Sequence, residues 1–256
     1  MLKCPICKSD LIKKAQTYQC QNGHSFDISK QGYTTLLLKG ANHSGDDAEL
    51  VKGRIDFLEK GYYEKLRDKV NEIIARNSGS IIVDAGCGEG YYTRSFADNA
   101  GEVYGFDMSK KTLKYASAHD PKSHYFLSSI YNLPIGDHTC DIATNIFAPA
   151  AIDEFKRIVK KGGILIKVDP GAKHLFELKT LLYDNPYLNE EKPLNDLELI
   201  DKEELTYQIE LKQEDLINLF KMTPYYYKSA VYGMEKLKHC NKIILTISFI
   251  IYTYRL

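Results

Sequence analysis

Ten residues decide the fold class of this chain: Ile81-Ile82-Val83-Asp84-Ala85-Gly86-Cys87-Gly88-Glu89-Gly90. An apolar, β-branched run that ends in an acid predicts a buried strand, and the glycine-rich turn after it leads into a helix expected over 91–97. Glycine allows positive φ and lets the backbone approach a ligand, while a helix N-terminus offers free N–H groups. The spacing Asp-x-Gly-x-Gly-x-Gly differs from the GxGxxG that wraps a pyrophosphate. The loop therefore predicts a ligand site at the end of the first strand of an α/β domain.

Two neighbouring segments support a nucleoside as the ligand. Residues 103–107 predict a second strand that ends in Asp107, 23 positions after Asp84, where a carboxylate can accept both ribose hydroxyls. The glycine loop resembles that of class I S-adenosylmethionine (SAM) methyltransferases, whose ligand carries a ribose and an amino-acid tail but no phosphate. Residues 128–134 resemble the segment that brackets the adenine in those enzymes, which makes Asn132 and Leu133 candidate contacts. The alternative, a tight turn in an α/β domain without a ligand, stays open on the glycines alone.

The rest of the chain alternates between helix and strand patterns. Helices are expected over 110–118 and 151–160, and strands over 124–127, 140–146 and 163–169. This alternation predicts a parallel, doubly wound α/β sheet with right-handed crossovers, the Rossmann-like fold of class I SAM-dependent methyltransferases. At the C-terminus, alternating apolar residues predict a last strand over 243–254, preceded by a strand over 225–231. An apolar run of about twelve residues is too short to cross a bilayer, so no membrane contact is expected.

The N-terminus contains a CxxC…CxxxH arrangement, made by Cys4, Cys7, Cys20 and His24 with twelve residues between the pairs. Each close pair fits on one tight turn, and four N and S ligands satisfy the tetrahedral preference of structural zinc. The segment between the pairs has the length of a small hairpin and too few apolar residues to fold alone. Disulfides are the alternative. Because no signal peptide is apparent and the other cysteines fall largely within predicted core elements, a reducing cytosol and a closed, structural zinc site are expected.

Charge is distributed unevenly along a chain whose formal net charge is zero. Residues 1–40 carry six Lys against two Asp, and residues 176–220 carry twelve acids against four Lys. The zero net charge argues against a simple nucleic-acid coat, whereas a basic ribbon on a neutral enzyme is typical of an RNA-binding head. A solvated surface of scattered lysines explains the same charges equally well.

From end to end, the chain resembles the rRNA large-subunit methyltransferase A family. Besides the four zinc ligands, the matching segments are 26–27, 32–33, 57–63, 84–93, 105–110, 148–149, 170–175 and 222–224. The resemblance implies a zinc-containing, SAM-dependent homodimer that methylates N1 of a guanine in 23S rRNA. It also implies a hairpin of domain II, near the peptide exit tunnel, as the substrate. The lysine- and isoleucine-rich composition favours the guanine linked to the tylosin-type macrolide response.

The loop and the resemblance together assign roles at the cofactor site. The residues expected beneath the methionine part of SAM or at the ribose are Asp84, Gly86, Gly88, Glu89, Gly90 and Asp107. The family implies that Tyr63 and His174 also touch the cofactor. On residue type alone, Tyr63 fits a core tyrosine and His174 a structural hydrogen-bonding group. Since Tyr63 lies upstream of the first strand, a helix of the linker must fold back over the site.

Methylation of guanine N1 requires an in-line transfer from sulfonium to nitrogen and the loss of the N1 proton. Asp169 and His174, near the end of the fifth predicted strand, are the candidate bases, and the sequence does not choose between them. Phe147 follows the fourth predicted strand, where an extruded base can stack on it. Residues 145–149 contain neither the Asp/Asn-Pro-Pro-aromatic motif of exocyclic-amine methylases nor the Pro-Cys of cytosine-C5 enzymes.

The predicted organisation has three parts. They are a zinc-binding ribbon for RNA recognition over 1–35, a linker and helix over the cofactor site at 36–75, and a methyltransferase domain over 76–256 with a cap-like insertion near 176–220. The expected location is cytoplasmic. Two other function classes stay open. A small-molecule SAM methyltransferase would turn over without RNA, and a non-catalytic zinc-ribbon RNA-binding protein would not bind SAM.

Overall fold

The N-terminal ribbon forms a small sheet of its own. The computed structural model describes residues 1–38, 47–77 and 79–256. Strands β1 (Leu11–Lys14), β2 (Thr17–Cys20) and β3 (Ser25–Asp27) pair antiparallel in that order. Ala15 turns β1 into β2 with a φ of 48°, in the left-handed region. The hairpin predicted between the two cysteine pairs is therefore confirmed.

The main sheet has the order β10-β11-β9-β8-β5-β6-β7-β4. Its strands are β4 (Thr34–Thr35), β5 (Ile81–Ala85), β6 (Glu102–Asp107), β7 (His124–Leu127), β8 (Cys140–Ile146), β9 (Val159–Pro170), β10 (Glu198–Lys212) and β11 (Lys242–Arg255). The strands from β4 to β9 are parallel, and β11 is antiparallel to both β9 and β10. Open α/β sheets bind ligands where the strand order reverses, which here is the crevice at the carboxyl ends of β5 and β8. The predicted Rossmann-like fold is confirmed.

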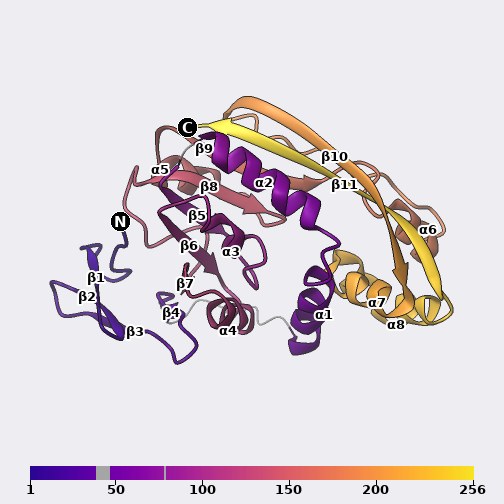
Figure 1. The fold of residues 1–256 in the computed structure, drawn as a ribbon, viewed down its shortest axis with the longest axis horizontal. Coiled ribbons are helices and arrows are strands. Elements are labelled where there is room, and N and C mark those ends of the chain that lie inside the picture. The colour runs from indigo at the N-terminus through magenta and orange to yellow at the C-terminus, as the bar shows by residue number, and fades with distance from the viewer. Residues whose placement is uncertain (39–46, 78) are drawn as a thin grey trace.

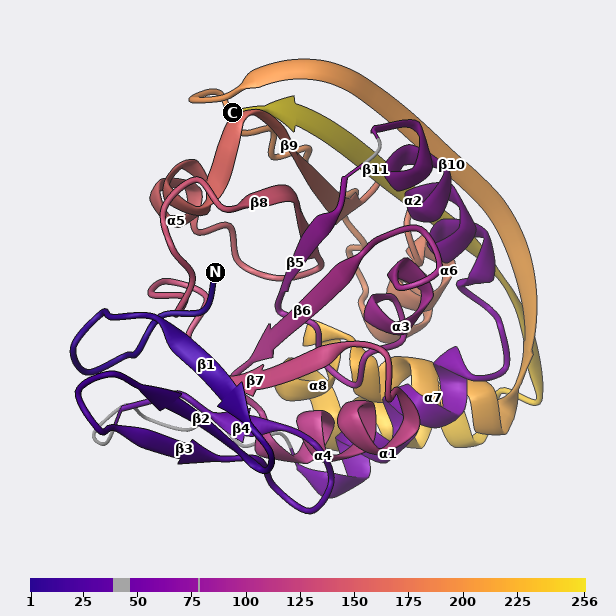
Figure 2. The ribbon, with the colours of Figure 1, turned by 60° about the vertical axis from the view of Figure 1, so that its left-hand side comes forward.

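Helices cover both faces of this sheet (Figure 1). They are α1 (Ala48–Leu58), α2 (Glu64–Asn77), α3 (Thr93–Phe96), α4 (Lys110–His119), α5 (Ile152–Ile158), α6 (Phe176–Leu182), α7 (Gln213–Met222) and α8 (Pro224–Lys238). On one face, α2 buries Leu66, Val70 and Ile73 at helical spacing against the sheet. On the other face, α5 and the ribbon share a second hydrophobic cluster, and Figure 2 shows the ribbon beside β7.

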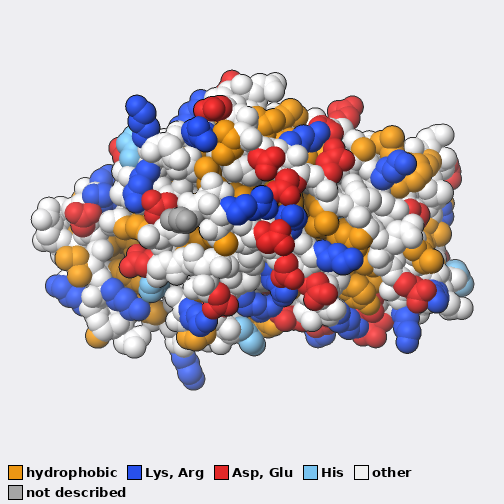
Figure 3. Space-filling view, turned by 45° about the horizontal axis from the view of Figure 1, so that its top comes forward, with side chains coloured by type: hydrophobic (Ala, Val, Ile, Leu, Met, Phe, Trp, Pro, Cys, Tyr) orange, Lys and Arg blue, Asp and Glu red, His pale blue; other side chains and the backbone are white. Residues whose placement is uncertain are grey.

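The carboxyl ends of the parallel strands are covered by helices from distant parts of the chain. Helix α1 packs on α7, and α7 packs on α8, so the three lie together at the lower right of Figure 1. Residues 176–220 supply α6, the edge strand β10 and α7 to this end of the molecule. Within the described residues, no helix is long and apolar enough to cross a membrane. Acidic and basic side chains are intermixed over the face in Figure 3.

The strand predicted over 225–231 is wrong, because these residues belong to helix α8. Pro224 occupies the first turn, where its missing N–H costs nothing, and the buried residues Tyr225, Gly233 and Leu237 repeat at multiples of four. The partner of β11 is instead β10, in which half-buried and exposed residues alternate over 203–210. That alternation is the strand signal in the acidic segment. The last strand, β11, is confirmed.

Candidate active site and zinc centre

The glycine loop is held in place by the buried carboxylate of Asp84. Its two oxygens accept hydrogen bonds from the hydroxyls of Thr93, at 2.6 Å, and Thr144, at 2.8 Å. Burial raises the pKa of Asp84 to about 6, although both hydroxyls act in the opposite direction. Because one threonine lies on α3 and the other on β8, Asp84 connects the strand, the loop and the following helix.

The three glycines of the loop have different surroundings. Gly86, Gly88 and Gly90 all have positive φ, at 92°, 55° and 81°. A Cβ on Gly86 would lie 2.6 Å from that of Ala148, and a Cβ on Gly90 would lie 2.8 Å from the hydroxyl of Tyr125. A Cβ on Gly88 would meet only the Arg54 guanidinium at 3.8 Å. Gly88 therefore presents backbone to open space, as a ligand-binding glycine requires.

Asp107 ends β6 beside the loop, as predicted. One carboxylate oxygen accepts the backbone N–H of Gly88 at 2.9 Å, and the other accepts that of Ser109 at 2.7 Å. Each oxygen of an ionised carboxylate has two lone pairs and can accept more than one donor at a time. Ribose hydroxyls are donors of this kind, and the position at the end of the second parallel strand matches their usual site.

Arg54 is a residue of the site that the sequence did not reveal. It projects from α1 to within 3.8 Å of the Glu89 carboxylate, at the open side of the glycine loop. Glu89 is buried, its Oε2 makes no hydrogen bond, and burial raises its pKa. The open side of the loop thus has a carboxyl group from Glu89 and a guanidinium cation from α1 close together. The zwitterionic tail of an amino acid has the complementary charges. No spacing rule singles out one arginine on an amphipathic helix.

Four aromatic side chains meet beside the loop. The ring of Tyr63 lies 5.0 Å from Phe249 and 6.5 Å from Phe147, and His174 lies 4.9 Å from Phe249. Phe147 follows β8 with a φ of 55°, and its side chain is 44% exposed. Positive φ in a bulky residue is strained, and such strain gathers at functional sites. The predicted residues Tyr63, Phe147 and His174 are therefore brought together.

His174 is held in one neutral tautomer. Its Nδ1 accepts the backbone N–H of Ser248 at 3.2 Å, so the ring proton belongs on Nε2, which lies 3.5 Å from the Tyr63 hydroxyl. Burial lowers the pKa of His174 to about 3. The imidazole is thus suited to orienting Tyr63.

Asp169, the other candidate base, points to the opposite face of the sheet. It pairs in register with Ile250, whereas the neighbouring residue Phe249 faces the aromatic cluster. Its carboxylate forms an ion pair with Lys167, which is almost fully buried. The backbone nevertheless brings Asp169 close to the aromatic cluster, because the N–H of Phe147 bonds to the carbonyl of Val168 at 3.1 Å.

The predicted adenine segment contacts the ribbon. The Asn132 side chain accepts a hydrogen bond from Lys8 at 3.3 Å, and Leu133 is buried in the cluster that includes ribbon residues. Lys3 also donates its backbone N–H to the carbonyl of Pro134 at 2.8 Å. The ribbon is thereby fixed beside the carboxyl end of β7. A contact of Asn132 or Leu133 with adenine stays a prediction.

The four predicted zinc ligands converge in the ribbon. The ligand atoms of Cys4, Cys7, Cys20 and His24 all lie within 4.8 Å of one another. The sulfurs of Cys7 and Cys20 are 3.7 Å apart, and Nδ1 of His24 lies 3.4 Å from the Cys20 sulfur. All four cysteine and histidine ligands fit the tetrahedral donor set of structural zinc. Since no donor position is left for a substrate, the centre is structural.

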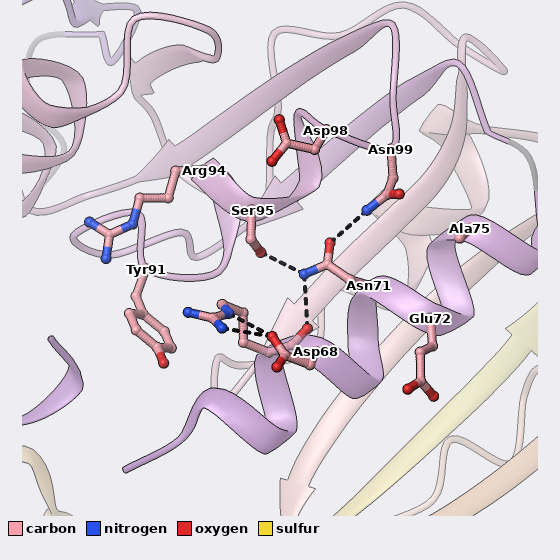
Figure 4. A pocket seen from close by; sticks show the side chains of 10 residues that line it. Asp68, Asn71, Glu72, Ala75, Tyr91, Arg94, Ser95, Asp98 and Asn99 are labelled. Atoms are coloured by element: carbon pink, nitrogen blue, oxygen red, sulfur yellow. Dashed lines mark hydrogen bonds and ion pairs between the residues drawn. The ribbon is translucent and has the colours of Figure 1, made fainter. Parts of the chain in front are cut away.

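A groove of about 610 Å³ lies between α2 and α3, on the outer side of the loop (Figure 4). Arg67 and Arg94 both approach the Tyr91 ring there, with their guanidinium carbons 5.7 and 5.6 Å from its centre. Both arginines are already paired, with Asp68 and Glu59 respectively. The groove therefore has no excess of positive charge for an anionic ligand.

Comparisons with known proteins agree with both parts of the chain. Residues 2–44 match the family model described as RlmA, N-terminal, a zinc ribbon, and residues 83–167 match that of a methyltransferase domain. The YcgJ protein of Bacillus subtilis has the same fold, with a TM-score of 0.50 at 16% identity over 72% of this chain and 95% of that one.

Curated relatives extend the likeness beyond the separate domains. A protein of Streptomyces fradiae named 23S rRNA (guanine(748)-N(1))-methyltransferase is 32% identical over 69% of this chain and 66% of its own length. A Bacillus subtilis protein, provisionally named 23S rRNA (guanine-N(1)-)-methyltransferase, is 33% identical over 73% of this chain and 70% of its own. The matched part of the chain thus spans about two thirds of these relatives.

Proposed function

The chain belongs to the family of 23S rRNA (guanine-N1)-methyltransferases, and from this we propose that it methylates N1 of a guanine in 23S rRNA. One observation carries the proposal: a four-ligand ribbon is fixed beside the carboxyl end of β7, in the same parallel sheet whose strand β5 leads into the glycine loop. RNA held by the ribbon therefore lies next to the place where a methyl donor binds.

The cofactor pocket is proposed from the loop outward. SAM, when bound, supplies an electrophilic methyl group on its sulfonium. The backbone of Gly86–Gly90 would lie under its methionine part, Asp107 would accept the ribose hydroxyls, and Glu89 and Arg54 would bind the charged tail. Tyr63, oriented by His174, closes the site from the linker side. Asp84 supports the loop from beneath through its two threonines.

The target base is proposed to stack on the exposed ring of Phe147. N1 lies on the Watson–Crick edge of guanine, so the base must be unpaired or flipped out to react. Transfer would form the bond from N1 to the methyl carbon, break the bond from that carbon to sulfur, and require the N1 proton to leave. His174 is neutral, and its acceptor nitrogen is occupied by Ser248. The carboxylate of Asp169 points to the opposite face of the sheet and is paired with Lys167, so we propose that solvent takes the N1 proton.

The finer substrate is part of the same proposal. We place the guanine in the hairpin loop of domain II near the peptide exit tunnel, at the position whose methylation accompanies macrolide resistance. The name of the Streptomyces fradiae relative, which specifies guanine 748, supports this choice. A loop lowers the cost of exposing the base, and sequence-specific RNA recognition usually targets single-stranded loops. The enzyme is proposed to act in the cytoplasm as a homodimer.

Methylation of defined RNA tests the function. An in vitro transcript of domain II should acquire one reverse-transcription stop, at a loop guanine, only with both SAM and the protein present. The Gly88→Ala variant, whose added methyl group lies at the ligand side of the loop, serves as the inactive control. A mark on another base, or turnover of a small molecule without RNA, would show that the chain is a methyltransferase of another specificity. Failure to bind SAM would favour the non-catalytic RNA-binding alternative.

A further inference from the structure

Helix α8 exposes a face on which aromatic and basic residues alternate. Tyr227 is 71% exposed and Tyr232 is 55% exposed, although large aromatic side chains are usually buried. Lys228, Tyr232 and Lys236 follow one another at steps of four residues and so form a single row along the helix. The Lys236 ammonium lies 4.4 Å from the centre of the Tyr232 ring. The row thus has one aromatic ring with a lysine one turn before it and another one turn after it.

The inner side of α8 fixes which residues face outward. Leu237 is fully buried, and Tyr225 packs against Tyr183 at a ring distance of 6.1 Å. A Cβ on Gly233 would lie 2.5 Å from the ring of Phe220, so α7 and α8 are in close contact at this point. Rotation of the helix would lose these contacts. The exposed tyrosines are therefore a consequence of the packing and are held in position by it.

The charge of α8 favours a polyanion. The helix sequence contains three lysines and a single acid, Glu235, whose carboxylate is already close to Lys238 and His239. Lys228 is exposed, and Lys236 covers only one ring face. Protein–protein interfaces are depleted of lysine, particularly at their centres, whereas this face has lysines on both sides of its aromatic ring. Single-stranded RNA offers bases for the rings and phosphates for the lysines.

The position of α8 suits a second RNA contact. Helix α8 packs on α7, α7 packs on α1, and Arg54 of α1 lies over the glycine loop. The ribbon flanks the loop from the β7 side. In Figure 1 the ribbon and α8 lie on opposite sides of α1. An RNA whose target base enters the site between them has strands running toward both.

We propose that the outer face of α8, formed by Tyr227, Lys228, Tyr232 and Lys236, binds single-stranded nucleotides that flank the target guanine. The inference rests on the proposed function, because it takes RNA to be the substrate. Two bases stack on the tyrosines and the neighbouring phosphates contact the lysines. The ribbon holds one side of the RNA, and α8 holds the other.

Binding of the full-length protein to the domain II transcript tests this directly. Tyr227→Ala combined with Tyr232→Ala should weaken RNA binding at least about fivefold. Tyr232→Phe keeps the ring and should therefore keep the part of the RNA affinity that Tyr232 contributes. Lys228→Ala combined with Lys236→Ala should weaken binding and flatten the slope of log affinity against log salt by about two. The matched control is Lys161→Ala, which removes an exposed lysine near the N-terminal end of β9, away from the carboxyl ends of the strands. This variant should bind RNA normally.

Two further measurements separate the outcomes. Calorimetric SAM affinity should be unchanged in every α8 variant, which shows that the fold is intact. If the unmodified protein methylates the transcript while the α8 variants bind it normally, this inference is wrong and the proposed function stands. If the variants instead change the sedimentation coefficient, the face is a contact between copies of the chain. If the unmodified protein does not bind RNA at all, the proposed function itself fails.

Discussion

The imidazole of His174 lies 3.5 Å from the hydroxyl of Tyr63, although 111 positions separate them in the chain. One residue follows the central strand β9, and the other lies in the linker before the first strand of the domain. Their contact closes the linker over the carboxyl edge of the sheet. The backbone N–H of Ser248 in β11 bonds to the other imidazole nitrogen. The neutral histidine therefore joins three segments: the linker, the turn after β9, and β11.

The neutral state of His174 predicts an acid-sensitive fold. Its pKa is about 3 in the folded protein and near 6.5 when unfolded, so only the unfolded state takes up a proton between these values. The free energy of unfolding should therefore fall as pH drops below 6.5, by up to about 1.4 kcal/mol per pH unit from this group. Urea denaturation at pH 7, 6 and 5 measures the slope. His174→Asn, which keeps an acceptor for Ser248, should show a shallower slope than the unmodified protein.

Alanine substitutions at two glycines of the loop should have different effects on SAM binding and on stability. Gly88→Ala places a methyl group in open space at the ligand side, so it should abolish SAM binding in calorimetry with a modest loss of stability. Gly90→Ala meets the Tyr125 hydroxyl and Ala116 at under 3.0 Å and should lower the urea midpoint markedly. Asp107→Ala should weaken SAM affinity by about tenfold or more, because it removes a carboxylate that accepts hydrogen bonds. Near-native SAM affinity in both Gly88→Ala and Asp107→Ala would contradict the cofactor assignment.

Local patterns in the sequence were sufficient to predict the parallel half of the sheet and the metal ligands. The glycine loop, Asp107 and the four zinc ligands are each set by spacing within a few residues, and the structure places them as predicted. The strand predicted over 225–231 failed because aromatic residues occur in both strands and helices, and the burial that decides between them comes from the packing of α8 on α7.

Residues that reach the site from distant elements lay beyond local patterns. Arg54 reaches the loop only because α1 packs on α7 and is thereby carried over the sheet edge. Asp169 and His174 are five positions apart, yet they face different sides of the sheet. Tertiary packing, which no short pattern records, decides both arrangements.

Arg54 is predicted to recognise the carboxylate of the methionine tail. Arg54→Gln should weaken SAM binding about tenfold, since it removes a charged donor. Methylthioadenosine has the same nucleoside but lacks the amino-acid tail, so its affinity should be the same in the variant and the unmodified protein. Calorimetry with both ligands measures the difference. An equal loss for the two ligands would mean that Arg54 acts on the loop as a whole through Glu89.

The ribbon is predicted to depend on one zinc ion per chain. Elemental analysis of freshly purified protein should give one zinc, and Cys20→Ala should unfold residues 1–30 because few apolar residues support them. RNA binding should fall, while SAM affinity should survive, since the glycine loop has its own supports in Asp84 and Asp107. Cys240→Ala, at a cysteine outside the ribbon, is the control and should retain both. Protein purified without metal would overturn the assignment.

The two base candidates predict different kinetic signatures. Asp169→Asn keeps the size of the side chain and changes a carboxylate that faces away from the aromatic cluster, so kcat and the SAM and RNA affinities should stay near those of the unmodified protein. His174→Asn should act mainly on SAM affinity, because the histidine positions Tyr63. Single-turnover methylation of the transcript across pH 6 to 9 measures both. In Asp169→Asn, as in the unmodified protein, the rate should rise with pH, since solvent base then removes the N1 proton more readily. A loss of about 10²-fold or more in kcat of Asp169→Asn, with unchanged affinities, would show instead that its carboxylate takes the proton.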